Sequence, residues 1–349
     1  MKPVVSRSHL ALSILLLAAL ACGLPGGAAT QPTEDVVSLY VTQTLAALAS
    51  AAPNQTPIPT VGPPGATPTP TITLTPGVTH TFFPADIQTA AVSVYDVDSR
   101  GTAPEHRAPY GDSYKLNRFE RPFTQNAMDY LPDVDILTYR INVDQNWYYV
   151  SVQLSGQSSS GGLTADYGLE LDFDRDGHGD YLVWVKPPFA SAWTTDGVTV
   201  YMDSNNDTGG LSPERADSNF SGNGYDQILI ASGRNGLDPD LAWARLDPRS
   251  SNTIQFAFKK SLVGGVFMWG VWADLGLRDP ARFNYNDYFT EEQAGSPEKS
   301  ETKFYPIKAV FAVDNTCRIP YGFKPSGYEP LLCPLDELNA LTATPTKVP

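Results

Sequence analysis

Residues 167–185, YGLELDFDRDGHGDYLVWV, contain two apolar runs on either side of a short turn rich in aspartate and glycine. In the first run, Leu169, Leu171 and Phe173 alternate with small or polar residues, which is the two-residue period of a β-strand. The second run, 181–185, is apolar at nearly every position and has the length of a strand buried on both faces. The stretch therefore predicts two strands joined by an Asp-rich loop.

The same pattern recurs from residue 86 onward, between connections rich in Gly, Asn and Asp. The further expected strands are 87–97, 134–143, 148–154, 198–202, 254–258, 266–272 and 307–313. No amphipathic helix longer than two turns is predicted after residue 100. About ten short strands with such connections indicate an all-β protein with a jelly-roll-like antiparallel β-sandwich. No linker interrupts residues 80–336, so we expect them to form one domain.

The first 21 residues have the features of a bacterial export signal. Lys2 and Arg7 give a positive start, and the apolar run over 10–21 is shorter than the roughly 20 residues of a transmembrane helix. Residues 19–22, Ala-Leu-Ala-Cys, resemble the lipobox of bacterial lipoproteins, although an alanine stands where that motif usually has leucine. The resemblance implies a lipid on Cys22 and a membrane-anchored protein at the cell surface, on the exported side. An ordinary secretory signal is the alternative.

Residues 22–79 are rich in Pro, Thr, Gly and Ala. This composition predicts a disordered Thr/Pro-rich tether, and the apolar spacing after Thr33 predicts one short helix within it. The tail 337–349 returns to Thr-Pro composition and is expected to be flexible.

The net charge of −14 belongs wholly to residues 80–349, because the charges of residues 1–79 cancel. Binding of phosphate backbones needs clustered Lys and Arg, so nucleic acid is not an expected partner. The chain has 27 Asp against 11 Glu, and the shorter side chain favours turns and metal-binding loops. The oligomeric state is not indicated by any pattern in the sequence.

Cys317 and Cys333 are the two cysteines other than Cys22. In an oxidising compartment, two cysteines sixteen residues apart most simply form a disulfide. Two free thiols are the alternative.

The loop 172–180 reads D-x-D-x-D-G-x-x-D, a spacing that supplies several oxygen ligands from one tight turn. Calcium takes roughly six to eight such ligands. The predicted ligands are the carboxylates of Asp172, Asp174, Asp176 and Asp180 and the backbone carbonyl of His178. The loop resembles the EF-hand loop, but Val183 stands where that loop has a bidentate Glu, and strands replace the flanking helices.

A second acidic segment, 203–207, reads D-x-N-x-D and follows an expected strand. Through Asp203, Asn205 and Asp207 it either completes the first calcium site or forms another. Without a cation, four carboxylates in one turn with only Arg175 beside them repel one another. We expect the calcium to be structural; a solvated acidic turn without an ion is the alternative.

Most catalytic classes do not fit the residue counts. Outside the signal region the histidines are His80, His106 and His178, whereas a zinc hydrolase needs two or three clustered together. A glycoside hydrolase needs only two carboxylates, and no pair can be selected from the sequence. Glu120 and Glu170 are possible acids, although the strand pattern places Glu170 on an outward, solvated face.

Aromatic side chains can stack on the apolar faces of sugar rings. Trp193 lies in a loop beside Pro and Phe residues, so we expect it to be available to a ligand. Tyr285 and Tyr288 lie in an Asn/Asp-rich segment that could line a polar groove.

Residues 133–139 and 146–152, followed by 167–185, resemble paired strands of the carbohydrate-binding family 9 and DOMON-like sandwiches. The resemblance covers roughly residues 130–275 and implies a jelly-roll-like sandwich, in some members with structural calcium and a sugar or haem ligand. No tryptophan pair can be matched, so the ligand does not carry over. The whole chain is also similar to bacterial surface lipoproteins with Thr-Pro tethers.

Together these patterns predict a lipid-anchored surface protein with a calcium-stabilised β-sandwich. We expect a non-enzymatic binding module for carbohydrate or another extracellular polymer. The alternatives are a surface glycan hydrolase with an unassigned carboxylate pair and a purely structural envelope protein.

Overall fold

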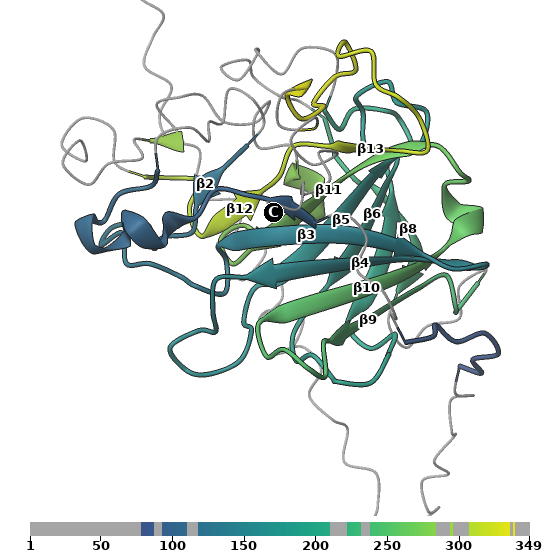
Figure 1. The fold of residues 1–349 in the computed structure, drawn as a ribbon, viewed down its shortest axis with the longest axis horizontal. Helices are drawn as coiled ribbons and strands as arrows, with labels where there is room; N and C mark the ends of the chain where they lie inside the picture. The colour runs from purple at the N-terminus through teal and green to yellow at the C-terminus, as the bar shows by residue number, and fades with distance from the viewer. Residues whose placement is uncertain are drawn as a thin grey trace, which may run out of the picture. The chain divides into compact units, whose positions relative to one another are not determined.

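Two antiparallel β-sheets packed face to face form the described part of the chain (Figure 1). The computed structural model describes residues 78–86, 93–109, 118–209, 222–231, 238–283, 294–295, 307–335 and 338. All of them belong to one unit, Thr73–Pro349. The predicted signal peptide, Cys22, the short helix and the tether up to residue 77 lie outside the described residues, as does the tail apart from Leu338.

The first sheet has five strands in the order β1-β3-β4-β10-β9. Their bounds are Ser93–Tyr95 for β1, Ile136–Val143 for β3, Trp147–Leu154 for β4, Thr253–Lys259 for β10 and Ala242–Leu246 for β9. In Figure 1, β3, β4, β10 and β9 cross in front of strands of the other sheet.

The second sheet has eight strands, seven of them in the order β2-β12-β11-β5-β6-β7-β8, and β13 pairs with β11. Their bounds are Glu120–Arg121 for β2, Val313–Asn315 for β12, Phe267–Asp274 for β11, Asp166–Asp172 for β5, Tyr181–Val185 for β6, Val198–Met202 for β7, Gln227–Ala231 for β8 and Ile319–Tyr321 for β13. Every strand pair of both sheets is antiparallel.

Helical structure among the described residues is confined to short segments. The 3-10 turns with defined bounds are η1 Ser99–Gly101, η2 Ala103–Glu105, η4 Lys260–Leu262 and η5 Pro280–Arg282. No helix in the described ranges is long and apolar enough to cross a membrane. The prediction of an all-β sandwich is confirmed.

The core between the sheets is built from alternate residues of facing strands. Val150 and Val152 of β4 belong to the same buried cluster as Leu169 and Leu171 of β5. These side chains leave water together because successive residues of a strand point to opposite faces of the sheet. Burying each one contributes about 1.5–3 kcal/mol relative to leaving it exposed.

The outer face of the eight-stranded sheet is covered as well. Trp184 of β6 and Trp272 of β11 belong to a second buried cluster, which includes Phe119 and Phe283 from segments outside the strands. The ring of Trp184 lies against β5 at Gly168, where an added Cβ would stand 2.9 Å from it. The polar positions of β5 therefore face a packed layer instead of solvent.

The expectation of a solvated Glu170 is wrong for this reason. Its position alternates with Leu169 and Leu171, as predicted, but it is only 4% exposed. A period of two indicates that a residue faces away from the central core, and it carries no information on whether another layer covers that face.

Strand positions were predicted well where the pattern was long or strongly apolar. Residues 181–185 and 198–202 are β6 and β7 without change. In the predicted strand 307–313, only Val313 belongs to a strand, as the first residue of β12. Four strands, β2, β8, β9 and β13, were not predicted. β2 and β13 have only two and three residues, too few to show a period, and β8 and β9 lie between loops rich in Asp, Gly and Asn.

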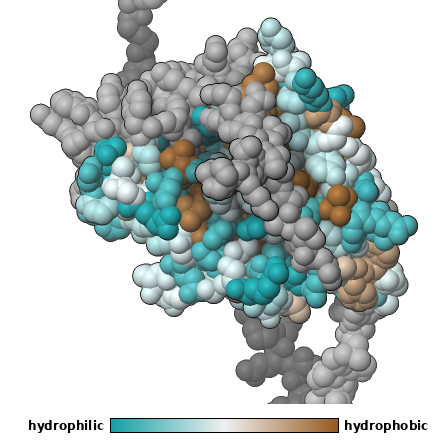
Figure 2. Space-filling view, viewed as in Figure 1, coloured by the Kyte–Doolittle hydropathy of each residue, from teal (hydrophilic) through white to brown (hydrophobic). Residues whose placement is uncertain are grey.

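The predicted disulfide between Cys317 and Cys333 is confirmed, with Cα atoms 5.0 Å apart. It closes the segment that carries β13. On the face seen in Figure 2, the described residues are mostly hydrophilic, and the hydrophobic areas are small and separate.

Candidate functional site

The Asp-rich loop joins β5 to β6 and is shaped by its own carboxylates. Asp172 accepts hydrogen bonds from the backbone N–H groups of Arg175 and Gly177. Asp174 accepts from the Asp176 N–H at 3.1 Å. Gly177 has a φ of 96°, a left-handed conformation that favours glycine and that permits the predicted sharp turn.

Three of the predicted ligands converge. One carboxylate oxygen from each of Asp172, Asp174 and Asp176 lies within 4.8 Å of the others. Asp172 is buried, Asp174 is exposed and Asp176 is intermediate. These side chains form an acidic cluster that can hold a metal ion.

The other two predicted ligands have protein partners. Asp180 accepts a hydrogen bond from the Phe173 N–H at 2.6 Å and is not part of the three-carboxylate cluster. The carbonyl of His178 accepts a long hydrogen bond, 3.4 Å, from Arg318.

Arg318 is the main cation beneath this loop, and no sequence pattern pointed to it. Its side chain is 2% exposed, and its guanidinium contacts Glu170 at 2.8 Å and Asp172 at 2.7 Å. The hydroxyl of Tyr225 donates a further hydrogen bond to Glu170 at 2.8 Å. Arg175, the cation expected from the sequence, lies instead over the ring of Phe323.

Charge and burial shift the pKa values of the loop carboxyls. Burial raises the pKa of Asp172 to about 6, although Arg318 and two backbone amides act in the opposite direction. Burial also raises the pKa of Asp180 to about 7, and repulsion from Asp174 and Asp172 adds to this effect. For Asp176, hydrogen bonds from Asn206 and His178 outweigh burial and lower the pKa. Burial is thus the main factor that disfavours charge on Asp172 and Asp180, whereas Asp176 is held in its charged form.

The second acidic segment, 203–207, lies beside the first loop. The side-chain amide of Asn206 donates to Asp176 at 2.9 Å. The Gly179 N–H donates to the Thr208 carbonyl at 2.9 Å. The segment therefore supports the Asp-rich loop from one side.

Its carboxylates stabilise their own turn and residues 223–224 beside it. Asp203 accepts hydrogen bonds from three backbone N–H groups that follow it. Asp207 accepts from the N–H groups of Asn223 and Gly224, both at 3.0 Å, and from the side chain of Asn205 at 2.8 Å. Neither aspartate belongs to the carboxylate groups that come within metal-binding distance in the described part of the chain. A second calcium ion at this place stays a prediction.

Trp193 is partly buried against the outer face of the five-stranded sheet. The guanidinium of Arg245 lies 4.3 Å from its ring centre, and its indole N–H donates to the carbonyl of Ala85. The expectation of a freely available ring is therefore not met, since Arg245 occupies one face. Tyr285 and Tyr288 lie outside the described residues.

The segment 78–86 covers aromatic residues on that outer face. Phe82 stacks on Trp147 with ring centres 5.3 Å apart, and Phe83 packs on Trp243 at the same distance. Asp240 fixes the segment by accepting hydrogen bonds from the N–H groups of residues 81 and 82.

A pocket of about 410 Å³ opens beside this segment. Its lining residues are Phe82, Gln145, Asn146, Lys259, Lys260 and Ser261. They come from three separate parts of the sequence and share no motif, which explains why the sequence did not predict the pocket.

Replacing Arg318 with Met should lower the free energy of unfolding by roughly 3–5 kcal/mol, because Glu170 and Asp172 would stay buried without their cation. Urea unfolding measures the change. The control is Arg175→Met on the exposed side of the same loop, which should change stability by less than about 1 kcal/mol. Equal effects of the two substitutions would contradict a stabilising role for the buried ion pairs.

The chain matches no known family model, no curated protein and no solved structure. Its function therefore has to be inferred from the chemistry of the sites described above.

Proposed function

We propose that this protein is exported and lipid-anchored through Cys22, and that its calcium-stabilised β-sandwich binds extracellular carbohydrate without cleaving it. The observation that carries the binding role is the pocket beside Phe82.

The pocket has groups that suit a sugar ring. The side chain of Phe82 is 37% exposed. It stacks on Trp147, and Lys259 Nζ lies 5.2 Å from its ring centre, so a sugar would meet the part of the ring that these two contacts leave open. Gln145 and Asn146 can both donate and accept hydrogen bonds to hydroxyl groups. The site is shallow and open, with one aromatic residue and a few polar groups, which suits a ligand held at the surface. Lys260 adds positive charge, which favours sugars that carry carboxylate or sulfate groups.

The calcium part of the proposal concerns Asp172, Asp174 and Asp176. Their donors are oxygen atoms only, which favours a hard cation such as calcium over zinc. An ion there would offset the mutual repulsion that burial and crowding create, and it would fix the loop between β5 and β6.

The disulfide supports export, because such bonds persist in oxidising compartments. The anchor itself rests on the lipobox resemblance at Cys22. An acidic domain that follows a long Thr/Pro-rich segment suits a protein that holds a binding domain away from the membrane.

A glycan hydrolase is the weaker alternative. The two acids considered from the sequence are Glu120, which is fully buried, and Glu170, which is held by Arg318. Neither carboxyl can contact a substrate in this structure. A purely structural envelope protein is the other alternative, and it predicts calcium binding without glycan binding.

Phe82→Ala and Asn146→Ala should each weaken glycan binding tenfold or more, because each removes a contact worth roughly 1.5 kcal/mol. A glycan array with neutral and acidic polysaccharides identifies the ligand, and calorimetry then measures its affinity. The matched control is Phe83→Ala, since Phe83 is 62% exposed on the same segment but does not line the pocket. If the array shows no binding to any glycan, the structural alternative is favoured.

Calcium should raise the melting midpoint of the full chain relative to EDTA. At a concentration 100 times the Kd, one bound ion stabilises by about 2.7 kcal/mol. Asp174→Asn combined with Asp176→Asn should reduce the number of bound calcium ions by one, whereas Asp196→Asn, an exposed residue elsewhere, should not. Unchanged calcium binding in the loop variant would refute the assignment.

The lipid anchor predicts that the mature protein partitions into the detergent-rich phase of a phase-separating extract. Cys22→Ala should move it to the aqueous phase, because the acylated thiol would be lost. Mass spectrometry of the mature N-terminus provides the independent check. An unmodified Cys22 in the exported protein would contradict the anchor.

A further inference from the structure

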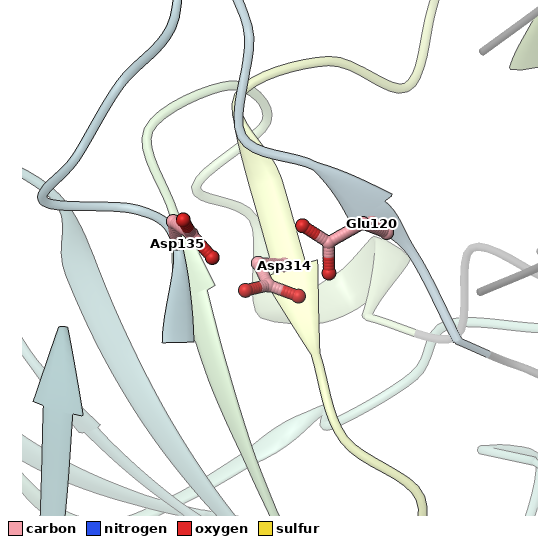
Figure 3. Close-up of side chains that lie close together, drawn as sticks. All are labelled: Glu120, Asp135 and Asp314. Atoms are coloured by element: carbon pink, nitrogen blue, oxygen red, sulfur yellow. The ribbon is translucent and has the colours of Figure 1, made fainter. Parts of the chain in front are cut away.

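A second group of carboxylates lies at the place where the two sheets meet (Figure 3). Glu120 of β2 and Asp314 of β12 lie opposite each other in the eight-stranded sheet. Asp135 directly precedes β3 of the five-stranded sheet. All three residues are completely buried. One carboxylate oxygen from each lies within 4.8 Å of the others, and in Figure 3 the three side chains turn toward a common space.

Hydrogen bonds account for only part of this cluster. The Ser99 hydroxyl donates to Glu120, and the Tyr130 hydroxyl donates to Asp135. The Ile136 N–H donates to Asp314 Oδ2 at 2.6 Å. The other oxygen, Asp314 Oδ1, is buried and has no hydrogen-bond donor within the described ranges. A buried carboxylate oxygen without a donor is costly and indicates a missing positive partner.

The electrostatic environment of Asp314 also indicates that a positive partner is missing. Asp314 makes no ion pair with a described Lys, Arg or His side chain. Burial raises its pKa well above the usual range, and repulsion from Glu120, Asp96 and Asp135 raises it further. Burial likewise raises the pKa of Asp135 to about 7, although the hydrogen bond from Tyr130 opposes this shift. The cluster needs either bound protons or a cation.

We propose that Glu120, Asp135 and Asp314 bind a calcium ion that joins the two sheets. All three donors are carboxylate oxygens, which suit a hard divalent cation. For three oxygens no more than 4.8 Å apart, an ion at their centre lies within roughly 2.8 Å of each, close to the calcium–oxygen distance of about 2.3–2.6 Å. Magnesium retains several of its waters, and a fully buried site offers little space for them.

The cluster is separate from the Asp-rich loop and does not depend on the proposed function. Along β11, Met268 pairs with Asp172 and Ala273 pairs with Asp314. Five residues of an antiparallel strand correspond to roughly 17 Å. Each site can therefore be removed without altering the other.

The test counts bound ions by native mass spectrometry on the full chain after removal of metals with EDTA and return of calcium. The variant Asp174→Asn with Asp176→Asn lacks the loop site and should retain one calcium ion. Adding Asp314→Asn should remove that ion, while the asparagine oxygen still accepts from the Ile136 N–H. The matched control is Asp166→Asn, a buried carboxylate elsewhere in the sheet, which should leave the ion in place.

A second measurement leaves the cluster unchanged and is therefore independent of folding defects in Asp314→Asn. In the loop variant, calcium should raise the melting midpoint by roughly 5 °C or more relative to EDTA. It should also slow hydrogen exchange of the Ile136 amide at least tenfold. If the loop variant binds no calcium and melts identically in EDTA, the cluster holds protons and the inference is wrong. That result would not contradict the loop site, because the wild type would then bind one calcium ion and the loop variant none.

Discussion

The guanidinium of Arg318, enclosed between Glu170 and Asp172, is the contact on which the Asp-rich end of the sandwich depends. Burial alone would lower the pKa of this arginine, but the two carboxylates raise it above its usual value and keep it charged. The adjacent disulfide closes the segment that carries Arg318, and the same guanidinium reaches the His178 carbonyl. One cation thus connects β5, the loop 172–180 and the C-terminal segment.

This arrangement follows from covering both faces of the eight-stranded sheet. In a sheet with one solvent-exposed face, the outward carboxylates can stay in water. Here a second apolar layer packs against the outer face of the eight-stranded sheet. Each carboxylate on it must then find a positive partner or take up a proton. Glu170 and Asp172 have the fixed charge of Arg318. Glu120, Asp135 and Asp314 lie instead between the two sheets, on the side of Ala273, and for them we infer a bound ion. The abundance of Asp therefore reflects both solvent-exposed turns and buried charge.

Much of the sandwich could be predicted because a strand shows a characteristic pattern of apolar residues over a few neighbouring positions. β6 and β7 were located without error from residues that neighbour one another in the chain. β2 and β13 were missed because two or three residues show no period, and β8 and β9 were missed although they are as long as β6 and β7, because loops rich in Asp, Gly and Asn surround them. Glu170 was placed in solvent because Phe119 and Phe283 lie far away in sequence. In the candidate site, the sequence spacing of Asp172, Asp174 and Asp176 was enough to predict that their carboxylates converge.

By itself, the sequence determined the all-β class, the Asp-rich turn with its glycine at position 177, and the disulfide partners, since residues 80–336 contain no other cysteine pair. Each of these depends on residues within about twenty positions of one another. Only the tertiary structure placed Arg318 beneath the loop, brought Asp314 to Asp135, and assembled the pocket beside Phe82. The first two contacts join residues more than 100 positions apart, and the pocket joins three separate parts of the sequence. Which distant strands become neighbours is decided by how the whole core packs.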